Sequence, residues 1–289
     1  TDMNQKKWSS KILLTLFIVG VAVQGLTLFG FKPKEKMIGL QLWSVKDHMK
    51  NDAKATIAKV GAMGYTFVET ASFDNGKFYG MSPLAFKKLC EDNGLKFLGS
   101  HTGQNMPDKA DWNKTMAWWD MAIAAHKEAG VKWIVQPWMG EEGYHSLEGL
   151  KDYIAYFSAV GEKCKAAGIQ FGYHNHDKEF TTVFDGKPAY DYMLELTDPD
   201  LVMFELDLYW INYGGKNALD YFEKYPGRFK LWHIKDEKEL GSGKMNFTDI
   251  FNAKKESGFE YGIVEVEEYN FDPLVSCEKS LSFLKSTNY

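Results

Sequence analysis

The sequence predicts an α/β protein whose main domain is a closed (β/α)8 TIM barrel. Eight short apolar segments each precede an amphipathic segment with helical spacing, a pattern typical of parallel βαβ units. Without an N-terminal leader the chain has about 260 residues, close to the ~250 typical of such barrels. No composition break or low-complexity linker divides this region. We therefore expect a leader at residues 1–30 and a single barrel domain over residues 31–289.

The predicted strands are short and apolar, and most of them end in polar residues. In chain order they cover 37–45, 66–73, 95–103, 131–139, 169–176, 201–210, 229–236 and 261–269. The predicted helices follow them at 52–64, 82–94, 111–130, 146–168, 188–197, 217–227, 247–258 and 272–286. Ser82 can cap the second helix, Pro83 suits its first turn and Gly94 closes it. A turn from Ser146 to Gly149 starts the fourth helix.

The leader has a basic start followed by an apolar run. Lys6, Lys7 and Lys11 precede the run Ile12 to Val23, which is typical of a secretory signal. An uncleaved anchor is the alternative, but the run is shorter than the ~20 residues of a spanning helix. We expect an exported, periplasmic protein without membrane contact beyond this segment.

The composition of the chain indicates which kinds of molecule it binds. The net charge is −5 and no Lys or Arg run is present, which argues against nucleic acid. Three widely spaced cysteines, Cys90, Cys164 and Cys277, are expected to be buried thiols. Aromatic residues make up 15% of the chain; most should fill the core, but rings at a pocket mouth would suit a small carbohydrate. Homo-oligomer formation stays open.

Charged residues gather at the C-terminal ends of the last four strands, where such barrels build their active sites. Residues two apart on a strand share a face, so these residues point inward in pairs. The pairs are His174 with His176, Glu205 with Asp207, His233 with Lys235, and Glu265 with Glu267. Because inward charges are costly unless paired or bound to metal, four such strands predict one shared site.

The side chains in this site fit a divalent cation such as Mn, Co, Mg or Zn. A metal held by histidine and carboxylates polarises a substrate carbonyl, and a neighbouring carboxylate can then remove the adjacent proton. Isomerisation, epimerisation and β-elimination of sugars all use this chemistry. We place Asp207, His233 and Glu265 at the metal because three strands bring them to one end of the barrel.

Other residues at the strand ends are predicted to contact substrate, and for some of them a purely structural role is the alternative. Those predicted to contact substrate are Trp43, Glu69, His101, Trp138, Trp210 and Glu267. His101 could equally be a structural hydrogen-bonding group, and Glu69 could hold its strand in place. Lys235 could form an ion pair with Asp236 or Glu267. Two further histidines are expected at the surface: His126 and His145.

Four motifs carry a resemblance to a known family: GYHNHDKEF, ELDLYW, LWHIKD and GIVEVEEY. With them the chain resembles the sugar phosphate isomerase/epimerase superfamily of xylose isomerase-like barrels, which includes D-tagatose 3-epimerase, inosose dehydratase and endonuclease IV. The resemblance implies metal ligands at Asp207, His233 and Glu265. The fourth ligand, a glutamate on the fifth strand in the epimerases, maps onto His174, with Glu179 as an alternative ligand or base.

This departure removes one of the two opposed carboxylate bases of the epimerases. The main hypothesis is a metal-dependent isomerase or epimerase acting on an unphosphorylated sugar or keto-sugar, such as a disaccharide or 3-keto-glycoside. Glu265, Lys235 and His176 are its predicted catalytic residues. One alternative is an inosose dehydratase-like lyase or keto-glycoside-cleaving enzyme. Two others are a glycoside hydrolase using Glu205 and Glu265 and a non-catalytic carbohydrate-binding barrel.

Overall fold

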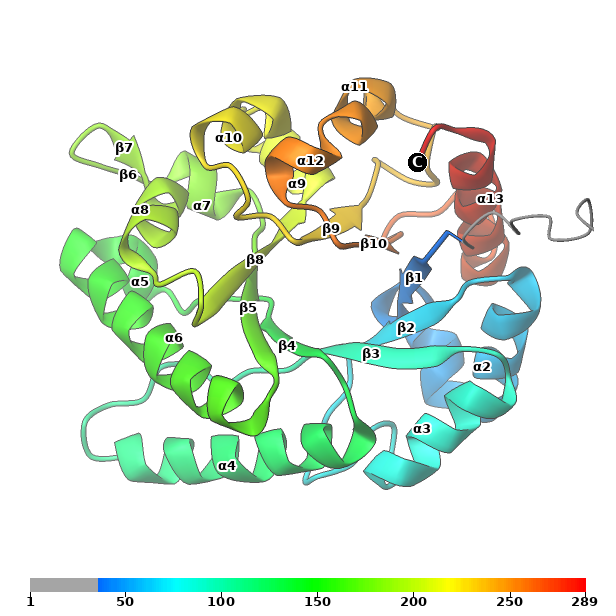
Figure 1. Ribbon diagram of the computed structural model, residues 1–289, viewed down its shortest axis with the longest axis horizontal. Helices are drawn as coiled ribbons and strands as arrows, with labels where there is room; N and C mark the ends of the chain where they lie inside the picture. The colour runs from blue at the N-terminus through cyan, green and yellow to red at the C-terminus, as the bar shows by residue number, and fades with distance from the viewer. Residues whose placement is uncertain (1–35) are drawn as a thin grey trace, which may run out of the picture. The chain divides into compact units, whose positions relative to one another are not determined.

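A computed structural model describes residues 36–289, and residues 37–289 form one compact unit, a closed (β/α)8 barrel (Figure 1). Its sheet runs β1, β2, β3, β4, β5, β8, β9, β10 and back to β1, with every pair parallel. The strands are β1 Ile38–Gln41, β2 Phe67–Thr70, β3 Lys96–His101, β4 Trp133–Gln136, β5 Gln170–His174, β8 Val202–Asp207, β9 Leu231–Ile234 and β10 Tyr261–Val264. The predicted barrel is confirmed, while the predicted leader lies outside the described residues.

Helices surround the sheet, as Figure 1 shows. The longer ones are α2 Lys46–Met63, α3 Pro83–Asp92, α4 Trp112–Ala129, α6 Leu147–Ala167, α8 Ala189–Leu196, α10 Ala218–Lys224 and α13 Pro273–Ser286. Shorter ones are η1 Leu42–Val45, α5 Glu142–His145, α7 Lys178–Thr181, α9 Leu208–Tyr213, α11 Phe247–Asn252 and α12 Lys254–Ser257, beside a hairpin of β6 Val183–Phe184 and β7 Lys187–Pro188. Several of these short elements were not predicted, since one turn is too short to show a period.

The predicted helix ends are largely confirmed. Ser82 Oγ accepts a hydrogen bond from Ala85 N, and Ser146 Oγ accepts one from Gly149 N at 3.0 Å. Helix α2 begins six residues before its predicted start, but Asp52 interrupts it with φ of −155°. The predicted start is therefore a kink inside the helix, where the carboxylate of Asp52 accepts from the N–H three residues on.

Apolar side chains fill the barrel interior on the N-terminal side of the polar strand ends. We call this part the lower half of the interior and the part at the C-terminal strand ends the upper half. The apolar side chains are Phe67, Leu98, Trp133, Val135, Met203, Leu231 and Ile263. Two glycines make room for the large rings among them. A Cβ on Gly39 would lie 2.2 Å from the Phe67 ring, and one on Gly99 would lie 1.8 Å from Trp133 Nε1. The packed lower half closes the barrel below the polar strand ends.

Between the sheet and the helices, one sequence prediction proves wrong. His126 is fully buried, although it was expected at the surface; His145 is exposed as expected. His126 Nδ1 lies 2.7 Å from the carbonyl oxygen of Ala122, and the ring packs against Phe73 and Phe78. This bond to its own helix and a contact of 3.3 Å between Nε2 and Thr102 Oγ1 satisfy both ring nitrogens, so the ring can be buried as an aromatic.

The three cysteines are buried and free, as predicted. Among residues 36–289, no helix is both long enough and apolar enough to cross a membrane.

Candidate active site at the C-terminal end of the barrel

The four side chains predicted to bind metal meet at one point. Each of His174, Asp207, His233 and Glu265 offers a ligand atom, and these atoms all lie within 4.8 Å of one another. His174 ends β5, Asp207 ends β8, His233 lies in β9, and Glu265 directly follows β10. All four are buried. We call them the outer group; their assignment to a metal stays a prediction.

The outer group fits a cation. Asp207 Oδ1 accepts hydrogen bonds from the N–H groups of Tyr209 and Trp210, but its Oδ2 is buried without a partner. A buried carboxylate oxygen left unpaired is costly. His174 Nε2 lies 3.9 Å from this oxygen. Nitrogen and oxygen donors around an unpaired carboxylate oxygen suit Mn, Co or Zn, in keeping with the predicted cofactor.

Electrostatics differ sharply within the outer group. Burial raises the pKa of Asp207 to about 7, although the charge of Lys235 opposes this rise. Burial also disfavours ionisation of Glu265, but the charges of Lys235 and His233 outweigh it and hold the pKa of Glu265 well below its usual range. Lys235 Nζ donates to Glu265 Oε2 at 3.1 Å and also pairs with Glu267. Glu265 is therefore ionised, as a ligand or base must be.

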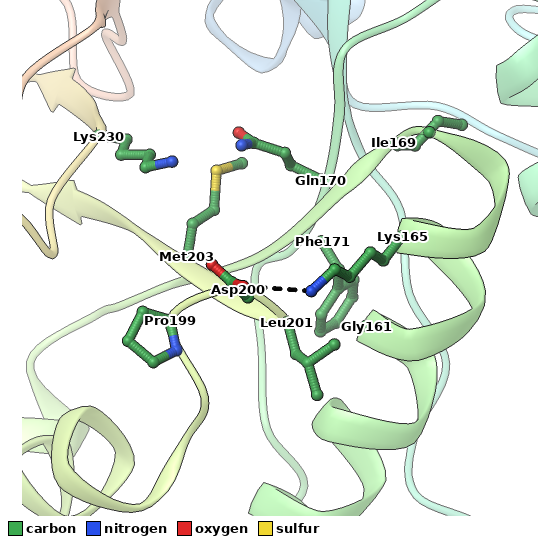
Figure 2. Close-up of a pocket in the computed structure, with 11 residues that line it drawn as sticks. Gly161, Lys165, Ile169, Gln170, Phe171, Pro199, Asp200, Leu201, Met203 and Lys230 are labelled. Atoms are coloured by element: carbon green, nitrogen blue, oxygen red, sulfur yellow. Dashed lines mark hydrogen bonds and ion pairs between the residues drawn. The ribbon is translucent and has the colours of Figure 1, made fainter.

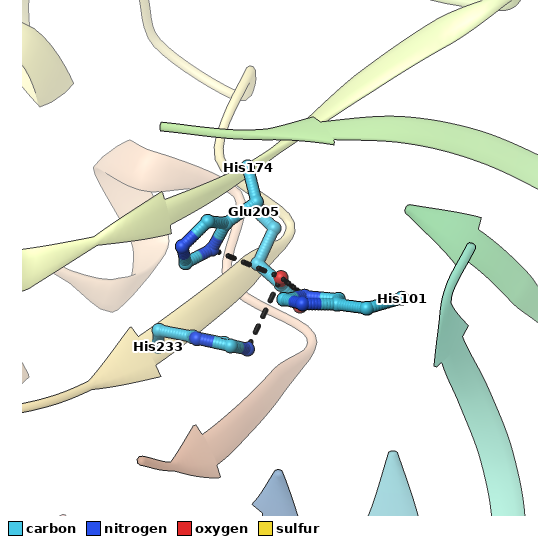
Figure 3. A group of neighbouring side chains, drawn as sticks. All are labelled: His101, His174, Glu205 and His233. Carbon is cyan, nitrogen blue, oxygen red and sulfur yellow. Dashed lines mark hydrogen bonds and ion pairs between the residues drawn. The ribbon is translucent and has the colours of Figure 1, made fainter. Parts of the chain in front are cut away.

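A second set of side chains adjoins the outer group, and Figure 3 shows two of its members, His101 and Glu205, beside His174 and His233. Glu205 Oε2 lies 2.7 Å from His101 Nε2, 3.1 Å from His233 Nε2 and 3.2 Å from His174 Nδ1. Glu69 Oε2 lies 3.0 Å from His233 Nε2 and 3.2 Å from His101 Nε2. We call Glu69, His101 and Glu205 the inner group; its two carboxylates are fully buried.

The three residues of the motif HNH, 174–176, have different surroundings. His174 belongs to the outer group, and His176 lines the pocket above it. Asn175 Oδ1 accepts from the N–H of Asp207 at 3.1 Å, so it ties β5 to β8 outside the pocket. Glu179 accepts from His176 N at 3.0 Å and from the hydroxyls of Tyr144 and Tyr173. Its carboxylate is thereby held away from the outer group and anchors the turn that carries His176.

A pocket of about 270 Å³ opens above the outer group. It is lined by Trp43, Ala71, His101, Pro137, Trp138, His174, His176, Glu265 and Glu267. Trp43 and Trp138 stand at its mouth, 41% and 39% exposed. Two residues predicted to touch substrate are not in its lining. Glu69 is enclosed beneath it, and Trp210 lies beside it, with its ring centre 5.6 Å from that of His176 and 5.6 Å from Lys235 Nζ.

Another hollow, of about 290 Å³, lies at the opposite end of strands β5 and β8 (Figure 2). Its charged residues include Lys165 and Asp200, which pair with each other at 3.3 Å, and Lys230. TIM barrels build their active sites at the C-terminal end of the strands, so we look for function at the other end.

The sequence analysis did not predict the two residues that hold Glu69 of the inner group in place. Trp133 Nε1 donates to Glu69 Oε1 at 2.6 Å, and Gln41 Nε2 donates to Glu69 Oε2 at 2.8 Å. Gln41 could have been found by alternation along its strand, because it lies at a strand end and faces inward. Nothing in the sequence distinguishes Trp133 from a core tryptophan, since its indole reaches across the barrel from a different strand.

The fold and the site define a (β/α)8 barrel with a buried histidine and carboxylate centre at its C-terminal end. Residues 57–287 match the family model described as xylose isomerase-like TIM barrel, so the chain belongs to this family.

Several proteins of known structure or known function are similar to this chain. A sugar phosphate isomerase/epimerase from Parabacteroides distasonis is 31% identical, with a TM-score of 0.82 over 91% of this chain and 98% of that one. A 3-keto-D-glucoside 4-epimerase from E. coli has a TM-score of 0.68 at 18% identity, covering 87% of this chain and all of that one. Inosose dehydratase from Clostridium perfringens is 27% identical over 164 residues, 48% of this chain. That match spans about half the length of the dehydratase.

Proposed function

We propose that this protein is a metal-dependent sugar isomerase or epimerase that removes a proton next to a carbonyl of an unphosphorylated sugar or keto-sugar. The observation that carries the proposal is the outer group, whose four ligand atoms converge within 4.8 Å under a pocket with two tryptophans at its mouth. Epimerases among the structural neighbours support the reaction type.

His174, Asp207, His233 and Glu265 would hold the metal, with Mn, Co, Mg and Zn as the candidates. When bound, a divalent ion supplies Lewis acidity that polarises the substrate carbonyl. The chain provides what the reaction needs besides: ionised carboxylates, a fixed lysine and a pocket that holds the sugar.

Proton transfer falls to residues that line or border the pocket. Glu265 is ionised and reaches the pocket, so it accepts the proton from the substrate carbon. Lys235 is held against Glu265 and Glu267 and supplies positive charge or a proton to the carbonyl oxygen. His176 lines the same pocket from another strand and serves as the second acid or base.

The pocket lining favours a neutral sugar. No Lys or Arg is among its lining residues, and Lys235, which borders the pocket, is already paired with Glu265 and Glu267, whereas a phosphate would call for free positive charges. A second hollow of about 440 Å³ shares Trp43 and Ala71 with the pocket and continues to Lys46 and Tyr79. A substrate of two units, such as a disaccharide or 3-keto-glycoside, could occupy both sides of Trp43. The keto-glucoside named for the E. coli epimerase belongs to this class.

An elimination reaction is the second candidate. Lys235 beside Glu265 and Glu267 supplies both a base and an acid at one wall, as loss of hydroxide requires. The curated relatives named inosose dehydratase favour this lyase reading. The hydrolase alternative loses support because Glu205 is enclosed among imidazoles and cannot reach a glycosidic bond.

The basic and apolar leader supports export to the periplasm, where unphosphorylated sugars would be available. Fractionation of cells carrying the tagged full chain tests this part separately: cytoplasmic retention of a fully active protein would contradict it.

The decisive experiment combines metal analysis with proton exchange. Purified protein is expected to hold one divalent ion per chain and to exchange substrate hydrogen with deuterium from solvent in at least one free sugar, keto-sugar or 3-keto-glycoside. Asp207→Ala and His233→Ala should lose both properties, while Asp191→Asn, a buried carboxylate on α8, should keep them. Sugar binding without exchange or turnover by the metal-loaded protein would instead indicate a non-catalytic barrel.

A further inference from the structure

The inner group has no assigned role in the proposed reaction, although it contains two fully buried carboxylates. Glu69 and Glu205 do not line the pocket, so neither can touch a sugar held there. Both instead surround the imidazole of His233, a member of the outer group. Buried charges are retained only with strong partners, and here the partners are the predicted metal ligands.

His233 faces different groups with its two ring nitrogens. Nε2 lies 3.0 Å from Glu69 Oε2 and 3.1 Å from Glu205 Oε2, whereas Nδ1 lies 3.3 Å from Glu265 Oε2. A neutral imidazole has one N–H and one lone pair. If the N–H is on Nε2, facing two carboxylates, the lone pair on Nδ1 faces the outer group.

Glu69 is itself held in place from two other strands. Trp133 Nε1 donates to its Oε1 at 2.6 Å, and Gln41 Nε2 donates to its Oε2 at 2.8 Å. The space for the Trp133 indole exists because residue 99 is glycine, where a Cβ would lie 1.8 Å from Nε1. A carboxylate fixed this firmly can fix the ring that it bonds.

We propose that Glu69, with Glu205, is a positioning residue that sets the tautomer and orientation of His233, so that His233 presents Nδ1 to the metal. Glu205 Oε2 is held by His101 at 2.7 Å and also lies 3.2 Å from His174 Nδ1, which makes no hydrogen bond. His174 Nε2 lies 3.9 Å from Asp207 Oδ2, and the inference concerns the tautomer of His233 alone. The inference rests on the proposed function in one respect only, that the outer group binds a divalent metal.

Carboxylates that accept the second N–H of a ligating histidine commonly raise metal affinity ten- to a hundredfold. Glu69→Gln keeps the shape and one acceptor oxygen, so we expect Zn²⁺ affinity to fall about tenfold; Glu69→Ala should lower it about a hundredfold. Asp191→Asn is the matched control, because Asp191 is a buried carboxylate bonded to Tyr221 and Lys224 instead of to a histidine.

The experiment measures the Zn²⁺ dissociation constant by chelator competition and the histidine tautomers by long-range ¹H–¹⁵N NMR of the Zn²⁺-loaded protein. We expect His233 of the wild type to carry its proton on Nε2, and Glu69→Gln to shift this tautomer population. The NMR measurement needs Zn²⁺ but no substrate, so it tests the inference even if the proposed reaction is wrong. Glu69→Gln is isosteric, so it carries the test if the alanine variant does not fold.

Two results would overturn the inference. One is a Zn²⁺ affinity and a His233 tautomer in Glu69→Gln that match those of Asp191→Asn. The other is a wild type that binds two ions per chain and loses one in His101→Ala, because the inner group would then be a second metal site.

Discussion

The lower and upper halves of the barrel interior are built from the same eight strands but from opposite chemistry. Phe67, Trp133 and Ile263 belong to an apolar cluster that fills the lower half. Two residues after Phe67 and Ile263, the side chains are Glu69 on β2 and Glu265 just after β10. The lower half gains free energy from burial, while the upper half holds charges that folding alone would not favour. The difference indicates that the lower half stabilises the barrel and the upper half serves its chemistry.

Asp207→Asn tests this division most severely. The amide keeps the shape and can still accept from Tyr209 and Trp210, but it removes a charge from the outer group. We expect metal to be lost and proton exchange to fall by about a thousandfold or more, because a metal supplies several kcal/mol of catalysis. The melting temperature of the metal-free protein should stay level or rise. A marked fall in that temperature would show that the upper half also stabilises the fold.

Phe67→Ala is the complementary change in the lower half. Phe67 is fully buried and meets Trp133 and Tyr261 edge-on. Its removal should cost about 3–5 kcal/mol of unfolding free energy, measured by urea denaturation. The exposed Val183→Ala should change it by less than about 0.5 kcal/mol. A small loss in Phe67→Ala would mean that the lower half is poorly packed.

Trp43→Ala tests the mouth of the upper half. Its ring borders both the pocket and the adjoining hollow. Loss of one aromatic contact should raise KM for a glycoside roughly three- to tenfold with kcat little changed, since stacking contributes about 0.5–1.5 kcal/mol. Leu84→Ala, an exposed apolar residue on α3, is the control. An equal effect on a monosaccharide would argue against a second unit bound beyond Trp43.

The last prediction concerns His126, which lies outside both halves. Burial lowers its pKa to about 4, although a hydrogen bond to Ala122 opposes the shift. As the pH falls from about 6.5 to 4, the unfolded chain gains a proton that the folded chain does not. This group therefore lowers stability by up to about 1.4 kcal/mol per pH unit in that range. The measurement is the free energy of unfolding between about pH 6.5 and 4, with chelator present to keep the protein free of metal. This free energy should fall less steeply with decreasing pH in His126→Gln than in the wild type. Equal slopes in the two proteins would contradict the prediction.

The sequence alone was enough to predict the barrel and to bring Asp207, His233 and Glu265 to one end of it, whereas His174 was assigned to the same group through the family resemblance, with Glu179 as the alternative. Alternation along a strand shows which side chains share a face, and the barrel rule brings the C-terminal ends of all strands together. The same rules placed Trp43, Trp138, His176 and Glu267 around one opening, where the pocket lies. These are local patterns, so a single chain displays them without any knowledge of packing.

Only the tertiary structure separated Glu69 from the pocket and showed His126 to be buried. It also joined Trp133, from β4, to Glu69 on β2 through the space left by a glycine on β3. Contacts of this kind depend on side chains that cross the barrel between strands distant in the chain. Their geometry is set by packing in three dimensions, which no periodicity along the sequence records.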